Sequence, residues 1–235
     1  MYDRTRRRAG RVLGGWLAVN VDPADGADGA DRGDRADAGD TGQRSTEERI
    51  MEATFRALLE HGYCDLSIAN IAEEFEMSKS SLYYHYDSKD DLLVAFLRFA
   101  AKRFEETTLS RPPSDPMADL EHLVEKLLPL EQRAEQREIQ TVMSELRSQS
   151  VTNAAFREEF SDIDDLLVAT IRDIVERGIE DGSFREVDST RVAEHVVATL
   201  NGARAARATT NRETAPAAVR VSLASYLDTT LRGRR

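Results

Sequence analysis

Hydrophobic residues recur every three or four positions from residue 45 to residue 231. This spacing places them on one face of each of a series of amphipathic helices. No stretch of the sequence alternates between apolar and polar residues, as a half-buried strand would. The pattern therefore predicts an all-α fold. The clearest example is the segment 153–180, whose apolar residues are Phe156, Phe160, Ile163, Leu167, Ile171, Ile174 and Val175.

Capping residues and helix breakers divide this pattern into separate helices. Ser45 or Thr46 is expected to cap the first helix, and Gly62 to end it. Three further serines are expected to begin the helices that follow, two short ones and then a longer one. A Pro-rich break at 111–116 then separates these helices from longer ones. The serine caps are Ser67, Ser78 and Ser88, and the later helices are expected at about 117–128, 131–149, 153–180, 189–207 and 215–231.

The first 44 residues differ in composition from the rest of the chain. They hold 8 of the 13 glycines, and their 8 Arg and 8 Asp cancel in charge. High polarity with many glycines predicts a disordered extension. The basic cluster at residues 4–11 leaves open an arm laid against nucleic acid, and the apolar run after it leaves open a secretion signal. A tail without a specific role, or a misassigned translation start, is the interpretation that we favour.

The chain carries a formal charge of −11, with 43 acidic residues against 28 Arg and 4 Lys. An acid excess with so little lysine resembles proteins that work in concentrated salt, and an ordinary acidic cytosolic protein is the alternative. No apolar run approaches the roughly 20 residues of a membrane helix, so we expect a cytoplasmic protein without membrane association. Cys64 has no second cysteine to pair with, no Cys/His cluster suits a metal, and no cofactor is expected.

Two short helices, at about 67–74 and 78–84, are joined by only three residues. Such helices need flanking helices as a platform, and this arrangement predicts a helix-turn-helix whose second helix enters the DNA major groove. That second helix carries serines as short donors and Lys79 as a cation, and its N-terminus can hold a phosphate. Tyr83, Tyr84 and His85 offer flat groups for phosphates or thymine methyls, and Lys89 can contact the backbone beyond.

The sequences IMEATFRALLEHGY, LSIANIAEEF and MSKSSLYYHYDSKDDLL resemble the DNA-binding domain of the TetR family of transcriptional regulators. The resemblance implies a three-helix DNA-binding domain at 45–92, joined through a fourth helix to a larger helical domain at 93–235 that binds an effector and dimerises. Glu76 stands where the family usually has Gly, and Ser80 where Gly is common. The implied contacts to double-stranded DNA are Ser67, Ser78, Lys79, Ser80, Ser81, Tyr83, Tyr84, His85 and Lys89.

Several of these residues have structural alternatives. Tyr83 could pack within the small domain, Ser67 and Ser78 could only cap helices, and His85 could simply be solvated. Leu82 and Phe75 are assigned to the core. The domain is also acidic, with 7 basic and 13 acidic residues from 45 to 110. We therefore expect DNA binding that depends less than usual on counterion release.

The resemblance further implies a cavity for a small-molecule effector among the middle helices. Residues that simply fill a core are the alternative for each candidate. Arg137 and Arg147 could pair with an anionic effector, or be solvated. The expected lining residues are Phe96, Phe99, Phe104, His122, Met143, Phe156 and Phe160.

Apolar faces of the last two helices are expected to form the homodimer interface, and a place in the core of the same chain is the alternative. The favoured function is a ligand-responsive repressor that binds a palindromic operator. An adaptor whose helix-turn-helix binds a protein partner is the alternative, and no phosphate loop or catalytic set indicates an enzyme. The expected interface residues are Val192, Val196, Leu200, Leu223, Tyr226 and Leu227.

Overall fold

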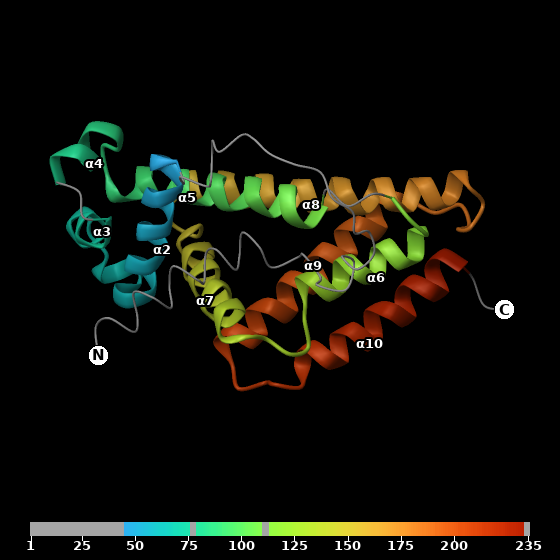
Figure 1. Ribbon diagram of the computed structural model, residues 1–235. Helices are drawn as coiled ribbons and strands as arrows, with labels where there is room; N and C mark the ends of the chain where they lie inside the picture. Colours follow the sequence, from blue (N-terminus) through green and yellow to red (C-terminus); the bar gives the residue numbers. More distant parts are fainter. Residues whose placement is uncertain (1–44, 76–78, 110–112, 233–235) are drawn as a thin grey trace, which may run out of the picture. The chain divides into compact units, whose positions relative to one another are not determined.

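The computed structural model describes residues 45–75, 79–109 and 113–232 (Figure 1). All regular structure in these ranges is helical, which confirms the all-α prediction. The chain divides into two compact units between Phe96 and Leu97, inside a single helix. Sequence analysis placed the domain boundary four residues earlier. The expected N-terminal extension at 1–44 lies outside the described residues.

The first unit is built around three helices and the beginning of a fourth. Ser45 caps the first of them through a capping box, in which Ser45 Oγ accepts from the Glu48 backbone N–H at 3.1 Å and Glu48 Oε2 accepts from the Ser45 N–H at 2.9 Å. Gly62 breaks the helical geometry near the end of that helix with φ 67°, a left-handed conformation that glycine adopts readily. The helices are α2 (Thr46–Asp65), α3 (Ile68–Phe75), α4 (Lys79–His85) and α5 (Lys89–Phe104).

The apolar faces of these helices form the core of the first unit. The rings of Phe55 on α2 and Phe96 on α5 stack with centroids 6.3 Å apart. Phe96 is only 2% exposed and contributes to this core, so its expected place in the lining of an effector cavity stays a prediction. The other buried hydrophobic residues of the unit are Ile50, Met51, Ala53, Ala57, Leu58, Leu66, Ile68, Ile71, Ala72, Leu82, Leu92 and Leu93.

The second unit holds the end of α5 and the longer helices predicted after the Pro-rich break. Asp115, Asn153 and Asp188 cap three of these helices with their side chains. Two helices end in π-helical turns that the sequence pattern did not predict. The elements are η1 (Glu105–Leu109), α6 (Pro116–Leu127), α7 (Ala134–Gln149), α8 (Ala154–Glu180), α9 (Ser189–Thr209), α10 (Ala215–Leu227) and η2 (Asp228–Arg232).

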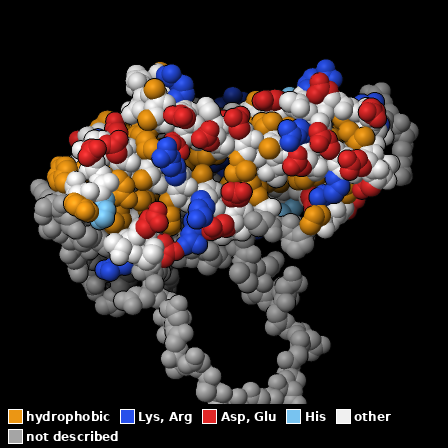
Figure 2. All heavy atoms as spheres, turned by 90° about the horizontal axis from the view of Figure 1, so that it is seen from above, with side chains coloured by type: hydrophobic (Ala, Val, Ile, Leu, Met, Phe, Trp, Pro, Cys, Tyr) orange, Lys and Arg blue, Asp and Glu red, His pale blue; other side chains and the backbone are white. Residues whose placement is uncertain are grey.

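Helix α8 forms the centre of this unit and packs against α6, α7 and α9, while α10 packs against α9. The apolar face predicted for 153–180 supplies Leu167, Ile171 and Val175 to the core. Phe184 closes the end of α8 over Gly178, where a side chain would collide with its ring. Acidic and basic side chains are interspersed on the surface shown in Figure 2, with hydrophobic side chains between them.

Candidate functional site

Helix α3 begins at a reciprocal cap. Ser67 Oγ accepts from the backbone N–H of Asn70 at 3.2 Å, and Asn70 Oδ1 accepts from the backbone N–H of Ser67 at 2.9 Å. Ser67 was expected to contact DNA, with capping as the alternative. The structure shows the capping role, because the Ser67 hydroxyl is engaged at the helix end and the residue is half-buried.

An ion pair fixes α3 against α2. Arg56 Nε on α2 donates to Glu74 Oε2 at 2.9 Å, and its Nη2 donates to the carbonyl oxygen of Glu74 at 2.8 Å. Both side chains are less than one fifth exposed. The guanidinium therefore holds the carboxyl end of α3, which is the point where the chain turns towards α4. Sequence analysis missed this pair, since nothing in the helical period links positions 18 residues apart.

Helix α4 buries one side chain and exposes the next two. Leu82 is fully buried, whereas Tyr83 is 55% exposed and Tyr84 is 86% exposed. His85 is exposed as well, with its ring edge-on to that of Tyr84 at 5.2 Å. Large aromatic side chains that contribute so little to a core are typical of binding surfaces. The packing alternative for Tyr83 does not match its exposure.

The other candidates on and before α4 are placed by the backbone alone. Lys79, Ser80 and Ser81 occupy the first turn of α4. Ser78 and the unusual Glu76 of the turn lie outside the described residues. The predicted short second helix is confirmed from Lys79 onwards, and it carries these polar residues immediately before the exposed aromatic residues.

Lys89 is held in place at the start of α5. Its Nζ donates to the carbonyl oxygen of Tyr63 at 2.8 Å and lies 4.2 Å from the centroid of the Tyr63 ring. The Tyr63 hydroxyl donates to Asp90 Oδ1 at 3.2 Å. Burial, followed by the charge of Asp90 and this hydrogen bond, raises the pKa of Tyr63. Lys89 is therefore a positioned cation, and Tyr63, which follows Gly62 near the end of α2, is the residue that positions it.

The seven expected effector-lining residues differ in burial. Phe156 and Phe160 are buried, at 0% and 5% exposed. Phe99, Phe104 and Met143 are partly buried. A cavity of about 390 Å³ between α6 and α10 includes His122 alone of the seven expected residues. Its lining is Ala118, Glu121, His122, Val124, Glu125, Arg220, Ala224 and Leu227.

The two arginines considered for an anionic effector have partners within the chain. Arg137 Nη1 donates to the carbonyl oxygen of Gln132 at 2.7 Å. Arg147 on α7 pairs with Asp164 on α8 and lies 5.0 Å from the centroid of the Phe160 ring. Arg147 is therefore part of a contact between α7 and α8.

Comparisons with known proteins agree with this arrangement. Residues 50–96 match the model "Bacterial regulatory proteins, tetR family", and residues 116–232 match "BetI-type transcriptional repressor, C-terminal". A TetR transcription regulator from Haloarcula marismortui is 34% identical, with a TM-score of 0.72 over 79% of this chain and 97% of that one. The chain belongs to the TetR family of transcriptional regulators.

Two further relatives of this TetR-family protein have a more specific description. The HTH-type transcriptional repressor AcnR of Corynebacterium glutamicum is 24% identical over 60% of this chain and 70% of its own. A putative transcriptional regulator from Saccharomonospora viridis, solved in complex with choline, is 26% identical with a TM-score of 0.66 over 79% of this chain and 96% of its own. The protein is a DNA-binding transcriptional regulator, in a family of regulators and not of enzymes.

The TetR-family protein buries the apolar faces that were expected to form its dimer interface. Five of the six expected residues are at most 2% exposed within a single chain, and Tyr226 packs against the same core. The alternative, a place in the core of the same chain, is what the structure shows. An amphipathic period identifies a buried face but not the element that buries it. The five are Val192, Val196, Leu200, Leu223 and Leu227.

A different surface of the same helices remains exposed. Val221 on α10 is 73% exposed and lines a hollow with Ser222, Ser225 and Tyr226. The Tyr226 ring lies 4.2 Å from that of His195 on α9, which is itself exposed. Within the ranges that the structure describes, no helix of this regulator is both long and apolar enough to cross a membrane.

Proposed function

We propose that the protein is a ligand-responsive repressor that binds a near-palindromic operator as a homodimer. The observation that carries the DNA-contact proposal is the pair Tyr83 and Tyr84, which are largely exposed on a helix anchored by the fully buried Leu82. This anchoring fixes the direction in which α4 presents its other side chains. Aromatic side chains held in this way can contact phosphates and thymine methyl groups.

The remaining contacts surround these tyrosines. Lys79, Ser80 and Ser81 precede them on α4 and provide a cation and short hydrogen-bond donors, while His85 follows. Lys89, fixed on the Tyr63 carbonyl oxygen, is a phosphate contact whose side chain loses little further entropy on binding. Ser78 stays in the proposed set from its position in the motif, and Ser67 acts through its cap on α3.

The dimer forms through the exposed surface of α9 and α10. Ala198 and Gly202 on α9 and Val221, Ser222 and Ser225 on α10 are all exposed. A Cβ atom added to Gly202 would meet nothing within 4 Å in the single chain, so this part of α9 leaves room for a close neighbour. Small residues at this surface allow two helices of a second copy to approach closely.

A matched pair of variants tests this interface. Val221→Arg places a charge at the proposed surface and is expected to give monomers in sedimentation velocity. Val151→Arg is the control, because Val151 is 78% exposed between α7 and α8, and it should leave the dimer intact. A dimer that persists in Val221→Arg would move the interface elsewhere.

The effector acts on the second unit. The related regulator from Saccharomonospora viridis was solved in complex with choline, which supports a small-molecule effector for this protein. An effector can only shift the equilibrium between DNA-binding and released states by its difference in affinity for the two. In a dimer whose half-sites lie at a fixed spacing, a change in the separation of the two α4 helices is sufficient for release.

The protein works in the cytoplasm at high salt. Its DNA-binding segment 45–110 carries 7 basic and 13 acidic residues, and a relative that is 34% identical comes from Haloarcula marismortui. Counterion release contributes little to affinity in molar salt. Affinity then depends on hydrogen bonds, apolar contacts and dehydration, with Lys79 and Lys89 as local cations.

A footprint on the DNA upstream of the protein's own gene tests the whole proposal. Two protected half-sites, persisting from dilute to molar KCl, are expected. Lys79→Ala should weaken protection, whereas Lys102→Ala, an exposed lysine on α5, should not. A steep loss of protection with salt would reject the high-salt mechanism. No protection at any salt would favour the adaptor alternative, in which the same α4 surface binds a protein.

A further inference from the structure

One arginine of the second unit has no ion-pair partner among the residues that the structure describes. Arg204 projects from α9, and burial, followed by the nearby charge of Arg147, lowers its pKa. An arginine side chain stays charged nonetheless. No hydrogen bond or ion pair joins the Arg204 guanidinium to any residue that the structure describes. The contact of Arg204 with α7 is made by its backbone, whose carbonyl oxygen accepts a hydrogen bond from Gln140 Nε2 at 2.8 Å.

A second arginine, one turn further along α9, is only partly satisfied. Arg207 Nη2 donates to the carbonyl oxygen of Pro129 at 2.7 Å. Its Nη1 atom is buried and has no hydrogen-bond partner among the described residues. Burial lowers the pKa of this guanidinium as well. Residues three apart on a helix share a face, so the free donors of Arg204 and Arg207 lie on the same side of α9.

The nearest carboxylate is already engaged on both oxygens. Arg147 donates to Asp164 Oδ2, and Asn201 Nδ2 donates to Asp164 Oδ1 at 3.1 Å. The charges that act on Arg204 are those of Arg147, Asp164 and Arg207. Asp164 on α8 is therefore the one carboxylate among the charges that act on Arg204, against the guanidinium groups of Arg147 and Arg207. Among the described residues, neither Arg204 nor Arg207 has an ion-pair partner.

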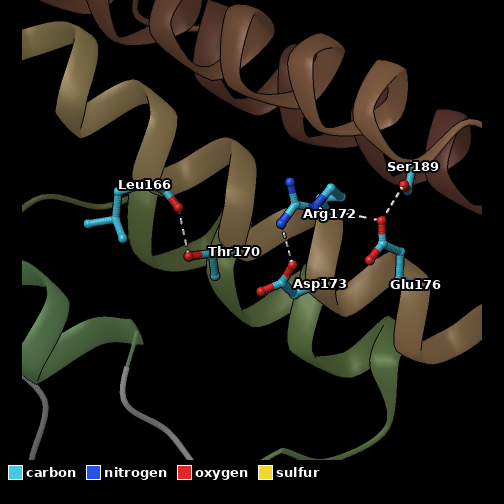
Figure 3. A network of polar contacts seen from close by, with 6 residues as sticks. All are labelled: Leu166, Thr170, Arg172, Asp173, Glu176 and Ser189. Carbon is cyan, nitrogen blue, oxygen red and sulfur yellow. Dashed lines mark hydrogen bonds and ion pairs between the residues drawn. The ribbon is translucent and has the colours of Figure 1, made fainter.

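Such an arrangement is unusual in a chain with 43 acidic residues. Arg172 on α8 shows the ordinary case of an arginine paired with carboxylates (Figure 3). Its Nη2 lies 3.0 Å from Asp173 Oδ1 and its Nε lies 3.6 Å from Glu176 Oε1, and Ser189 Oγ donates to the same Glu176 oxygen. Removing a guanidinium from water without a counter-charge is costly, and so is an unsatisfied buried donor. A bound anion would offset both costs, because it supplies the missing counter-charge and accepts a hydrogen bond from the unsatisfied donor.

We propose that Arg204 and Arg207, beside the Arg147–Asp164 pair, bind the oxyanion group of a small-molecule effector, a carboxylate or a phosphate. This assignment rests on the proposed ligand-responsive function and specifies the chemical class of the ligand. The planar fork of Arg204 suits two-point contact with an oxyanion, and Arg207 Nη1 supplies a further donor. The buried Phe160 ring, whose centroid lies 5.0 Å from the Arg147 guanidinium, packs against that side chain beside the proposed site.

The residues of the proposed site are partly exposed to solvent. The side chains of Arg147 and Asp164 remain 37% and 29% exposed, and Arg204 and Arg207 are half-buried residues. A cation would meet two uncompensated positive charges at this position. The site therefore discriminates by charge, favouring anions over quaternary ammonium compounds.

Binding of simple oxyanions to the full chain tests the proposal. Potassium phosphate and potassium acetate are added to the protein at an ionic strength matched with KCl, and Tm and Kd are measured. At least one of the two anions, phosphate or acetate, is expected to raise Tm until the effect saturates. The anion that binds with the lower Kd identifies the class of oxyanion. Arg204→Gln should weaken that binding by about tenfold or more, because a charge-assisted contact is lost. Arg172→Gln, the matched control, should bind as the wild type does.

The anion-free protein separates this role from a structural one. Arg204→Gln removes an uncompensated charge, so its Tm without phosphate or acetate should equal or exceed that of the wild type. If it does not fold, Arg204→Lys keeps the charge but lacks the fork, and it should bind severalfold more weakly. Equal anion affinity in the wild type and these variants would overturn the proposal, as would a wild-type Tm that responds no more to either oxyanion than to KCl.

The DNA footprint distinguishes this proposal from the wider function. Without added anion, Arg204→Gln should protect the operator as the wild type does. When the tighter-binding oxyanion is added, the wild type should be released from the DNA, whereas the protection by Arg204→Gln should persist. A wild type that binds the oxyanion but never protects DNA would reject the regulator function and leave the anion site standing.

Discussion

Arg98 Nε on α5 donates to Oε1 of Glu159 on α8 at 2.7 Å, and the glutamate is only 5% exposed. The hydrogen bond and charge of Glu159 raise the pKa of Arg98. Arg98 lies two residues beyond the point where α5 enters the second unit. The pair therefore anchors the second-unit part of α5 to α8.

Arg98→Met is expected to lower the free energy of unfolding by about 1–2 kcal/mol, because it leaves a buried carboxylate without its partner. The loss is smaller than for a fully buried pair, since the Arg98 side chain is 68% exposed. Adding Glu159→Gln should recover part of the loss. Urea denaturation of both single variants and the double variant measures the coupling, and strictly additive effects would show that the pair is not coupled.

Asp119 on α6 predicts a pH dependence. Burial favours a raised pKa, but hydrogen bonds from Ser114 and the ion pair with Arg177 outweigh it and lower the pKa of Asp119. Because the folded pKa lies below the unfolded value, the carboxylate stabilises the protein fully above about pH 4, and this stability is lost as pH falls through the folded pKa.

Asp119→Asn should therefore reduce stability at pH 7 by about 1–2 kcal/mol and flatten the loss of stability between pH 4 and pH 2. Denaturation at several pH values measures this. Asp173→Asn, at a position exposed on α8, should keep wild-type stability at pH 7. An acid limb that is equally steep in Asp119→Asn and the wild type would contradict the assignment.

Neighbouring residues on α4 should separate binding from folding. Tyr84→Ala, at a position 86% exposed, should change stability by no more than about 0.5 kcal/mol while weakening DNA binding. Leu82→Ala, at a fully buried position, should cost about 2–5 kcal/mol of stability. Thermal unfolding and DNA titration of the two variants test this contrast. A Tyr84→Ala variant with wild-type DNA affinity would remove Tyr84 from the contact surface.

Two glycines at the end of α8 should respond to alanine for different reasons. A Cβ at Gly178 would lie 2.2 Å from Phe184 Cδ2, and this overpacking should cost about 1–3 kcal/mol, partly offset by the better helix propensity of alanine. Gly182 has open space but a φ of 78°, so alanine there should cost about 1 kcal/mol through backbone strain. Chemical denaturation compares them, and a stabilised Gly178→Ala would show that Phe184 moves without cost.

The sequence determined the local structure of this protein. The period of three and four fixed the helices, and short-range hydrogen bonds fixed their ends, as at Ser45, Ser67 and Asn153. The helix-turn-helix was also predictable, because its residues are close together in the chain. These features depend on neighbours within four residues, so the sequence itself contains the necessary information.

Only the tertiary structure decided which surface covers each apolar face and which charges meet. Val196 and Leu223 have the same helical spacing whether they face their own core or a second copy, and only the packing of α9 and α10 shows that they lie inside. Arg98 and Glu159 are 61 residues apart. The helical pattern does not distinguish Arg204 from other arginines, and only the structure shows that its guanidinium has no ion-pair partner among the described residues. Burial and pairing depend on contacts between distant segments, which no local period specifies.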